Sequence, residues 1–524
     1  MMGHSIVITC KDIGRYLKNN KVVLLSILFA LACYGFMLTR YSLQIDEETW
    51  IKNTDPSLIT LWLKQGRFGL YVFDLIFSPL GRYIPILWDV LAVLLWTFAG
   101  IIFSFCISMV SRDFSRFSIF AFCAVFSSVP FVVGEVLSFS MFNLQQALAM
   151  VLVAVSVCFV FMYYQHRRKG LMAVSALLLF IASSFFQAFP AVFISAIVIY
   201  VLLSVLNDPA IKVSALLKDI LRAAGVFAAG VGLYYIVNLV ITIYVSPGGE
   251  GYFSSAYIGW GDGTGVIVPL LRTMKRSLSV LAGLEIVGGL SMLLTTALFI
   301  VYAASVLRQK TARKLSVIVF SLLLMLSMFS LQLAFAMPNI VGRTYLAVPL
   351  VCATVIFLAL NVVRLKWARV LTAVMVCVLL AFNIYSLNDY YLQSFRAYQQ
   401  DKLLAQKLSE DISAQGFDDS GKTLVLVGQY TAETQTKDYG PATGSFFNWD
   451  GGNMRRMIDF MQAEGYPVSY PSKEQIAAGL NLSDAMPSWP EKGSIIPCEN
   501  GLVVKFSKVA PQWYVINGVA ELAP

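Results

Sequence analysis

The sequence predicts a polytopic α-helical membrane protein that carries a small α/β domain outside the membrane. Hydrophobic residues make up 58% of the 524 residues and charged residues only 13%, whereas soluble proteins average about 25% charged residues. Charge-free apolar runs such as 22–38 and 91–110 approach the roughly 20 residues that span the hydrocarbon layer of a bilayer. The segment 388–524 is much more polar, which indicates a separate domain.

The apolar runs predict about eleven transmembrane helices. They lie at about 22–39, 84–110, 117–133, 144–164, 171–187, 190–206, 223–245, 283–306, 315–336, 345–362 and 369–387. Lys and Arg accumulate in cytoplasmic loops and so set the orientation. Nineteen of them fall in six short segments on the side of the N-terminus, and nine fall in the longer segments on the opposite side. We therefore expect a cytoplasmic N-terminus and an external C-terminal domain.

Two domains follow from this pattern. Residues 1–387 form the transmembrane domain, with a long first external loop at 40–83, and residues 388–524 form the external α/β domain. Within the loop, the apolar residues of 58–63 followed by Lys64 and Arg67 suggest a short helix in the membrane interface. In the C-terminal domain we expect two strands, at 422–428 and 502–506, and two helices, at 453–464 and 472–478.

Charge and composition exclude several classes of function. The net charge of +9 comes from basic residues in short loops between apolar runs, which is the pattern of membrane orientation and not of nucleic-acid binding. Six of the eight cysteines lie within apolar runs, and only two histidines are present, so no metal site or disulfide framework is predicted.

The acidic cluster Asp46-Glu47-Glu48 is the densest acidic group in the predicted external loops of the membrane domain. It follows the first span by a few residues, and Arg67 and Arg82 follow it in the same loop. A solvated acidic loop and a catalytic site are both compatible with this composition. The flanking apolar residues Leu43, Ile45 and Trp50 would hold the acids at the interface, which favours catalysis.

Several short motifs resemble a known enzyme family. Residues 41–47 (YSLQIDE) and 62–68 (WLKQGRF), together with Leu137-Ser138-Phe139, Gln145-Gln146 and 184–188, are similar to the Gtr-type serotype-converting glucosyltransferases. A long first external loop with acids just after the first span is also a hallmark of the GT-C glycosyltransferase fold. The sequence departs from the family at Phe68, where a tryptophan is usual, and at Glu47, where a second aspartate is usual.

The resemblance implies an enzyme of the bacterial inner membrane. It would transfer glucose from undecaprenyl phosphate–glucose to O-antigen repeats of lipopolysaccharide on the periplasmic side, as in serotype conversion, without a metal or cofactor. Two alternatives stay open: a polysaccharide polymerase or ligase with a pyrophosphate-linked donor, and a flippase or transporter of a lipid-linked sugar. Charged residues are almost absent from the spans, which speaks against transport because a transport path needs polar groups near the membrane centre.

The site residues follow from the resemblance and from the chemistry of the transfer. A carboxylate must take the proton of the acceptor hydroxyl, and Asp46 is assigned that role with Glu47 as its helper, although the two roles could be reversed. Arginine would bind the phosphate of the donor, and Arg343 and Arg67 are assigned to it, with Arg272, Lys275 and Arg276 as alternatives. The residues expected to contact the sugar or acceptor are Glu135, Gln187 and Trp62.

Overall fold

The computed structural model describes most of the chain, in two compact units. The described residues are 10–52, 59–77, 84–111, 114–208, 210–245, 258–260, 263–284, 286–309, 313–337, 339–416, 422–432, 437–498 and 501–522. The first unit comprises Met1–Leu38 and Ile59–Asn388, and the second comprises Thr39–Leu58 and Asp389–Pro524. The first part of the predicted external loop therefore groups with the C-terminal segment. Arg82 and the loop residues 53–58 and 78–83 lie outside the described residues.

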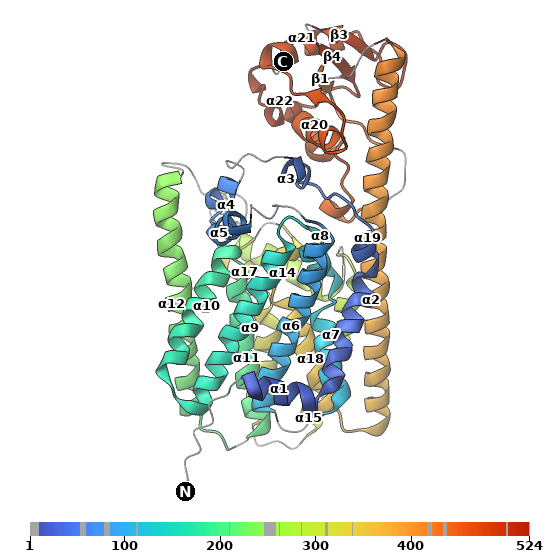
Figure 1. Cartoon of the computed structure of the whole chain (residues 1–524). Coiled ribbons are helices and arrows are strands. Elements are labelled where there is room, and N and C mark those ends of the chain that lie inside the picture. The colour runs from blue at the N-terminus through green and yellow to red at the C-terminus, as the bar shows by residue number, and fades with distance from the viewer. Residues whose placement is uncertain are drawn as a thin grey trace. The chain divides into compact units, whose positions relative to one another are not determined.

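The first unit is a bundle of helices (Figure 1). Its members up to the middle of the chain are α1 (Cys10–Asn19), η1 (Lys21–Leu24), α2 (Leu25–Thr39), α4 (Thr60–Lys64), α5 (Phe68–Phe77), α6 (Leu87–Val110), α7 (Arg116–Phe126), the π-helical turn η4 (Pro130–Gly134), α8 (Glu135–Ser138), α9 (Asn143–His166), α10 (Lys169–Phe185), α11 (Phe189–Asn207) and α12 (Val213–Val245). The later members are α14 (Ile267–Leu281), α15 (Gly289–Arg308), α16 (Lys314–Ser327), α17 (Ser330–Phe335), η5 (Gly342–Thr344), α18 (Val348–Val362) and the first half of α19 (Lys366–Ala414).

Each of the eleven predicted spans falls on an apolar helix. Among the described residues, eight helices are long and apolar enough to cross a membrane. The predicted spans at 171–187, 315–336 and 345–362 fall on the shorter apolar helices α10, α16 and α18. The protein therefore has the helices of a membrane protein, while the number of crossings and their orientation stay predictions.

The helix α19 extends well beyond the predicted end of the last span at 387. Hydropathy falls at Asn388-Asp389, but the helix continues to Ala414. In the second half, Ala405, Leu408 and Ile412 are fully buried. This spacing of three and four residues forms one apolar stripe on the helix, so the same helix changes from a mostly apolar surface to an amphipathic one.

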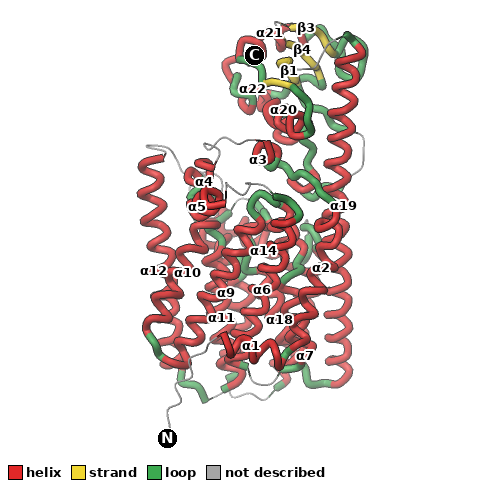
Figure 2. Tube along the Cα trace, in the orientation of Figure 1, coloured by secondary structure: helices red, strands yellow, loops and turns green. Residues whose placement is uncertain are grey.

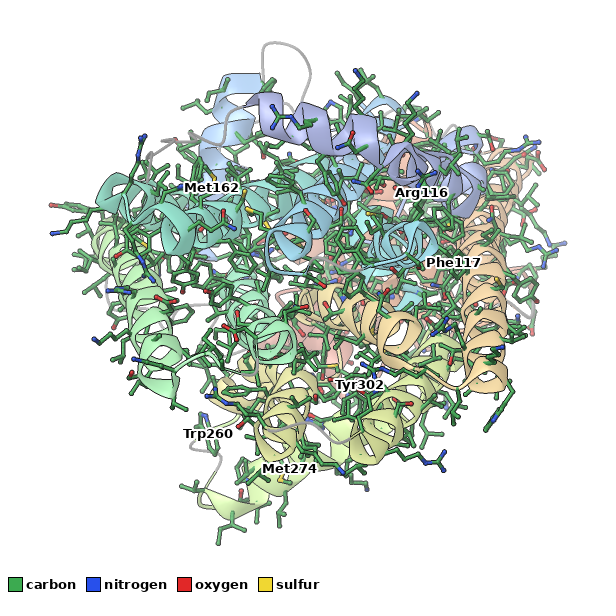
Figure 3. The ribbon with its side chains drawn as sticks, turned by 90° about the horizontal axis from the view of Figure 1, so that it is seen from below. Arg116, Phe117, Met162, Trp260, Met274 and Tyr302 are labelled. Carbon is green, nitrogen blue, oxygen red and sulfur yellow. The ribbon has the colours of Figure 1, made fainter. Side chains whose placement is uncertain are left out.

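Helices of the first unit pack through apolar side chains and a few internal polar contacts. Helix α6 packs on α9, α9 on α10, and α7 on α18. Figure 3 shows the side chains that fill the space between the helices; Tyr302 of α15 is fully buried there, with its hydroxyl 3.0 Å from that of Ser321 on α16. At the start of α6, the buried carboxylate of Asp89 accepts hydrogen bonds from Ile86 N, Ser140 Oγ and Asn143 Nδ2. Such interhelical hydrogen bonds fix how the helices pack.

The second unit contains the strands (Figure 2), in a four-stranded sheet of order β2-β1-β4-β3. The strands β1 (Lys422–Val427) and β4 (Gly501–Lys505) confirm the two predicted strands and pair in parallel. Strand β2 (Val468–Ser469) is parallel to β1, and β3 (Ile495–Cys498) is antiparallel to β4. Neither β2 nor β3 was predicted. Strand β2 has only two residues, too few to show the alternation of apolar and polar residues that marks a strand. Strand β3 lies at the edge of the sheet and contains Pro497, which interrupts the strand pattern.

The helices of the second unit confirm the two predicted C-terminal helices and add shorter ones. Helix α20 (Met454–Ala463) begins at the side-chain cap of Asn453, and α21 (Lys473–Ser483) begins at a capping box formed by Ser472 and Gln475. Helix α21 packs on the central strands at Gly479, where a Cβ atom would meet Val425 at 2.7 Å. The remaining members are α3 (Glu48–Lys52), η6 (Gly440–Thr443), η7 (Trp449–Gly451), α22 (Pro511–Ile516) and η8 (Ala520–Leu522).

Candidate functional site

The predicted site residues are divided between the two units. Asp46 and Glu47 belong to the second unit. The residues assigned to donor and sugar binding belong to the first: Trp62, Arg67, Glu135, Gln187 and Arg343. Two sets of contacts therefore have to be considered, one around the acids and one around the arginines.

Asp46 lies in a group of three carboxylates around one arginine, the Arg456 cluster, which consists of Asp46, Glu48, Asp450 and Arg456. Nη2 of Arg456 donates hydrogen bonds to Asp46 Oδ1 at 2.9 Å and to Asp450 Oδ2 at 3.1 Å. Nη1 of Arg456 donates to Glu48 Oε1 at 2.6 Å. The side chain of Arg456 is 10% exposed and that of Glu48 is 3% exposed, whereas that of Asp46 is 55% exposed. One buried cation thus holds several acids, of which Asp46 is the most accessible.

Local backbone structure brings these side chains together. Arg456 lies in the first turn of α20, after the cap at Asn453, and Glu48 is the first residue of α3. Asp46 has φ 83° and Asp450 has φ 58°, in the left-handed region that residues other than glycine rarely adopt. Strained backbone of this kind gathers at functional sites, where surrounding contacts hold it in place. Here the contact that holds both aspartates is the guanidinium of Arg456.

The carboxyl group of Glu48 has an unusual acidity. Its burial raises the pKa to about 8, against the opposing effect of the nearby Arg456 guanidinium, and the negative charges of Asp46 and Asp459 add to the rise. Within the described part of the chain, the buried Oε2 atom of Glu48 has no hydrogen-bond partner. Burial therefore favours the protonated form of Glu48, whose Oε1 atom accepts the hydrogen bond from the arginine.

Glu47 lies outside the Arg456 cluster. It is fully buried, and its Oε2 accepts a hydrogen bond from the backbone N–H of Gln44 at 2.9 Å. The side chain of Gln44 in turn donates to Ser394 Oγ on α19. Glu47 therefore stabilises the turn that carries Asp46, and Glu48 is the acid that shares an arginine with Asp46.

Two members of the Arg456 cluster, Asp450 and Arg456, are not indicated by the sequence, whereas Glu48 belongs to the predicted acidic cluster but was assigned no role. Arg456 follows Asp46 by 410 positions, and no local motif connects the two segments. Arg455, beside it, is 71% exposed; it lies 3.8 Å from Asp459 and 6.0 Å from the ring centre of Tyr470. Only the tertiary structure distinguishes these two neighbouring arginines.

In the first unit, Glu135 and Arg343 bind each other. Nη1 of Arg343 donates to Glu135 Oε1 at 3.1 Å, and the backbone N–H of Gly342 donates to Glu135 Oε2 at 2.8 Å. The guanidinium of Arg343 also lies 5.4 Å from the ring centre of Phe139. The side chains of Arg343 and Glu135 are 23% and 17% exposed. The predicted phosphate ligand and one predicted sugar ligand thus form a single half-buried ion pair.

Trp62 and Arg67 also contact each other. The buried Trp62 of α4 donates from Nε1 to Asp74 Oδ2 at 2.7 Å. The guanidinium of Arg67 lies 5.9 Å from the Trp62 ring and 4.9 Å from the Phe186 ring. Such positions over ring faces are favourable for a cation. The short helix expected around 58–67 is present as α4, and its tryptophan is packed inward.

Gln187 holds the turn that precedes Arg67. Its Nε2 donates to the backbone oxygen of Gln65 at 2.8 Å and to the hydroxyl of Tyr234 at 3.0 Å, and Tyr234 donates to the backbone oxygen of Gly66. Gly66 has φ 70°, and a Cβ atom there would meet Asn238 and Tyr234 within 3 Å. Glycine is therefore required at this turn both by its backbone angles and by the close approach of α12.

This turn borders a large cavity in the first unit. The cavity has a volume of about 640 Å³ and is lined by residues of α10, α11, α12 and α17, most of them apolar. Its polar lining includes Gln65, Gln187, Tyr234 and Asn238, and Lys64 contributes the charged group. Among the residues that the structure describes, no group of three or more His, Cys, Asp or Glu side chains is suited to hold a metal ion. The cavity can accommodate a long apolar group with a polar end.

A comparison with protein families identifies the family of the chain. Residues 35–360 match the model of the family described as glucosyl transferase GtrII. The chain belongs to this family. The match confirms the resemblance to Gtr-type glucosyltransferases, and it makes the protein a glycosyltransferase with a sugar donor and an acceptor. No match is found among curated proteins. The matched segment includes every predicted site residue, but it ends before Asp450 and Arg456.

Proposed function

We propose that this glucosyltransferase transfers glucose from undecaprenyl phosphate–glucose to a sugar hydroxyl of O-antigen repeats on the periplasmic side of the bacterial inner membrane. The family supplies the reaction class, and the distribution of basic residues supports the orientation. Nucleotide sugars are confined to the cytoplasm, so a transferase on the other side uses a lipid-carried donor. The observation that best supports such a donor is the large cavity of the first unit.

The cavity suits a polyprenyl phosphate in shape and polarity. Its volume of about 640 Å³ falls in the usual range of roughly 300–1,000 Å³ for small-molecule sites. Side chains such as Phe227, Leu239 and Phe335 give it apolar walls for part of an isoprenoid chain. Lys64 contributes a positive charge at the polar turn, and Arg67 follows that turn directly. A phosphate monoester is an anion and needs a cationic partner.

The chemical step needs one carboxylate. The oxygen of the acceptor hydroxyl attacks C1 of the glucose while the bond between C1 and the phosphate oxygen breaks. The hydroxyl proton passes to Asp46, and the electron pair of the broken bond leaves with undecaprenyl phosphate. Because a phosphate is a stable anion, the leaving group needs a cation and no general acid. General-base catalysis of this kind contributes roughly 10²–10⁴-fold to a rate.

Arg456 is the positioning residue for this base. It binds Asp46 through Nη2 while Nη1 is held by the buried Glu48. With Glu48 protonated, the guanidinium faces the carboxylates of Asp46 and Asp450, so the cluster keeps a net negative charge. A carboxylate in such a cluster remains able to accept a proton, whereas a carboxylate paired one to one with an arginine is a weaker base.

The test uses purified full-length protein in lipid nanodiscs with undecaprenyl phosphate–glucose, labelled in the sugar, and O-antigen polysaccharide. We expect labelled polysaccharide to form, and we expect Leu239→Trp, which fills the cavity, to weaken donor binding. Leu233→Trp, an exposed position on the same helix α12 outside the cavity, is the matched control. Transfer from UDP-glucose in the absence of the lipid carrier would contradict the proposal, as would movement of the donor across the bilayer without any transfer.

A further inference from the structure

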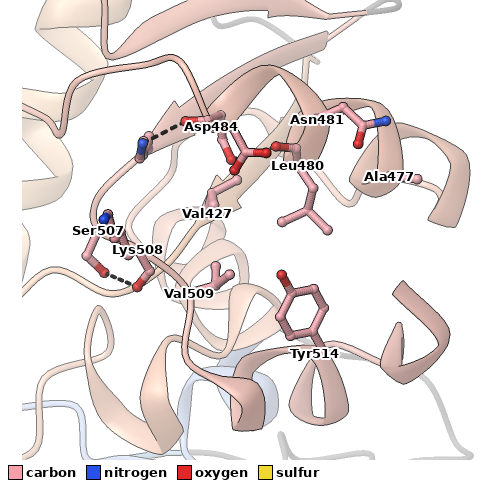
Figure 4. Close-up of a pocket in the computed structure, with 11 residues that line it drawn as sticks. Val427, Ala477, Leu480, Asn481, Asp484, Ser507, Lys508, Val509 and Tyr514 are labelled. Carbon is pink, nitrogen blue, oxygen red and sulfur yellow. Dashed lines mark hydrogen bonds between the residues drawn. The ribbon is translucent and has the colours of Figure 1, made fainter. Parts of the chain in front are cut away.

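The second unit contains its own cleft, which the glucosyl transfer described above does not use. It has a volume of about 530 Å³ and is lined by residues of α21, α22 and the ends of β1 and β4 (Figure 4). This volume also falls in the usual range of about 300–1,000 Å³ for small-molecule sites. The whole cleft lies beyond residue 360, where the family match ends. It is therefore a feature of the C-terminal segment of this chain.

The cleft lies where open α/β sheets bind ligands. Its lining includes Val427, the last residue of β1, and Lys505, the last residue of β4. These two strands are parallel neighbours, so their carboxyl ends meet at one edge of the sheet. From β1 the chain runs through α20 to β2, which pairs with one edge of β1. It later returns as β4, which pairs with the opposite edge of β1. The boundary between β1 and β4 is thus a topological switch point, where ligands bind outside the carboxyl ends of the strands.

Hydrogen bonds make the floor of the cleft rigid. The backbone N–H of Phe506 donates to Val427 O at 2.8 Å, and that of Gln429 donates to Ser507 Oγ at 3.1 Å. The buried Lys505 donates from Nζ to the backbone oxygens of Ser483 and Met486, both at 2.7 Å. Its charge therefore stabilises the C-terminal end of α21, where carbonyl groups lack partners within the helix.

The accessible groups of the cleft select for a neutral ligand. With Lys505 bound to carbonyl groups, the two charged side chains left in the lining are Asp484 and Lys508, which are exposed and opposite in sign. Asn481 and Ser507 add neutral hydrogen-bonding groups. Figure 4 shows Tyr514 rising from α22 with its hydroxyl pointing toward Leu480. A tyrosine ring offers an apolar face with a polar tip, which suits the mixed surface of a sugar ring.

We propose that this cleft is a saccharide-binding subsite for the acceptor glycan. The ligand class is a neutral, polyhydroxylated sugar chain, of which the cleft holds one or two residues. A bound phosphate is disfavoured because Lys505 is already occupied by carbonyl groups and the charge of Lys508 is offset by that of Asp484. The identification of the glycan as the acceptor rests on the proposed function, whereas binding of a neutral saccharide to the cleft does not require catalysis.

The test measures saccharide binding directly, on full-length protein in detergent without any donor. Oligosaccharides prepared from O-antigen are titrated while saturation-transfer difference NMR records their contact with the protein. We expect Tyr514→Ala and Asp484→Ala each to weaken binding about tenfold. Lys473→Ala is the control, since it lies on the same helix α21 but outside the cleft, in an exposed pair with Glu521. Asp484 is exposed, so that variant keeps the test valid if Tyr514→Ala fails to fold.

Kinetics then separate this inference from the proposed function. In the transfer assay, both cleft variants should raise KM for the acceptor about tenfold with kcat and donor affinity unchanged. If wild-type protein binds the saccharide but transfers no glucose, the proposed function fails and the cleft stands. An unchanged saccharide affinity in both variants would contradict the proposal that the cleft binds the saccharide. Displacement of the saccharide from the wild-type protein by inorganic phosphate would contradict it as well.

Discussion

The two units each join an arginine to acidic side chains, but in different proportions. In the second unit, Arg456 binds three carboxylates and is almost fully buried. In the first unit, Arg343 binds one carboxylate, that of Glu135, and both side chains are partly exposed. The Arg456 cluster therefore has an excess of negative charge, whereas the pair in the first unit is balanced.

The difference in proportion separates two chemical roles. A cluster with more acids than cations retains carboxylates that can accept a proton, which is what a general base requires. The carboxylate of a balanced pair is a weaker base. Its arginine can exchange that carboxylate for a phosphate, because both anions can bind a guanidinium through two oxygens. We therefore propose that the second unit contributes the group that accepts the proton and that the first unit contributes a cation that binds the donor phosphate.

The largest expected effect tests the base. Asp46→Asn keeps the shape of the side chain and removes the proton acceptor, so transfer should fall by at least roughly 10²-fold while donor binding stays normal. The measurement is the turnover of purified protein at saturating acceptor, since a binding defect could imitate a chemical one. Asp450→Asn is the matched control, because it contacts the same Nη2 atom of Arg456. Near wild-type turnover in Asp46→Asn would remove Asp46 as the base.

Glu47→Gln sharpens the same test. Its side chain accepts a hydrogen bond from Gln44 N, and an amide oxygen can still accept that bond. We therefore expect a loss of less than about tenfold in turnover, since a neutral acceptor weakens one hydrogen bond by roughly 1 kcal/mol. If Glu47→Gln were inactive and Asp46→Asn active, the roles of the two acids would be reversed.

The second effect tests whether the arginine of the cluster positions Asp46. Arg456→Gln removes the hydrogen-bond donor shared by Asp46, Asp450 and the buried carboxyl of Glu48, and leaving a buried polar group without its partner costs roughly 1–3 kcal/mol. We expect a lower unfolding temperature and a loss of turnover of about tenfold or more. Arg456→Lys should recover part of the turnover but not all, because a point charge lacks the fork that binds two acids.

A neighbouring arginine provides the control for this variant. Arg455 is 71% exposed, with a long 3.8 Å contact to Asp459 and its guanidinium 6.0 Å from the Tyr470 ring, so Arg455→Gln should leave turnover and stability near wild type. The readout that a purely structural role would not change is the pH profile of turnover, which should change in Arg456→Gln because the positive charge next to Asp46 is removed. Equal behaviour of the two glutamine variants would contradict a positioning role for Arg456.

The third effect tests anion binding in the first unit. Arg343→Ala should weaken binding of the lipid-phosphate donor by about 10- to 100-fold, which corresponds to the roughly 1.5–3 kcal/mol of a charge-assisted hydrogen bond, and Arg343→Lys should recover only part of it. Glu135→Gln should leave donor affinity unchanged or increase it, because it frees the arginine from a competing carboxylate. Binding is measured by titration of undecaprenyl phosphate into nanodiscs. Unchanged affinity in Arg343→Ala would leave Arg67 as the better candidate.

Sequence patterns predicted the elements of both units because their signals are local. Apolar runs located the apolar helices, and the capping residue Ser472 and the short apolar run in 422–428 located elements of the α/β domain. The pairing of Arg456 with Asp46 could not be predicted in this way, because it joins segments 410 positions apart and nothing local separates Arg456 from Arg455. The same holds for Glu135 and Arg343, which were assigned to different ligands although they bind each other.

The smallest expected effect concerns the pH dependence of the Arg456 cluster. The groups that face Glu48 are Arg456, Asp46 and Asp459, and burial raises its pKa from 4.5 to about 8. Between these values the folded protein keeps the proton of Glu48 while the unfolded chain loses it, so the unfolded state binds fewer protons. The contribution of Glu48 to the free energy of unfolding is therefore greatest below about pH 4.5. It falls as the pH rises toward 8 and does not change further above that pH.

Glu48→Gln should remove this pH dependence, because an amide has the polarity of the protonated acid and does not titrate. We expect hydrogen–deuterium exchange of the amides in α20, corrected for the intrinsic effect of pH on exchange, to show a local opening free energy that falls between pH 5 and pH 8 in the wild type. In Glu48→Gln the same free energy should stay nearly constant. Glu464→Gln, which alters another carboxyl of the second unit at the C-terminal end of α20, should retain the wild-type slope. A wild-type opening free energy that rises with pH would mean that Glu48 is ionised in the folded protein. In that case the cluster would hold three charged carboxylates, and Glu48 would become a second candidate for the base.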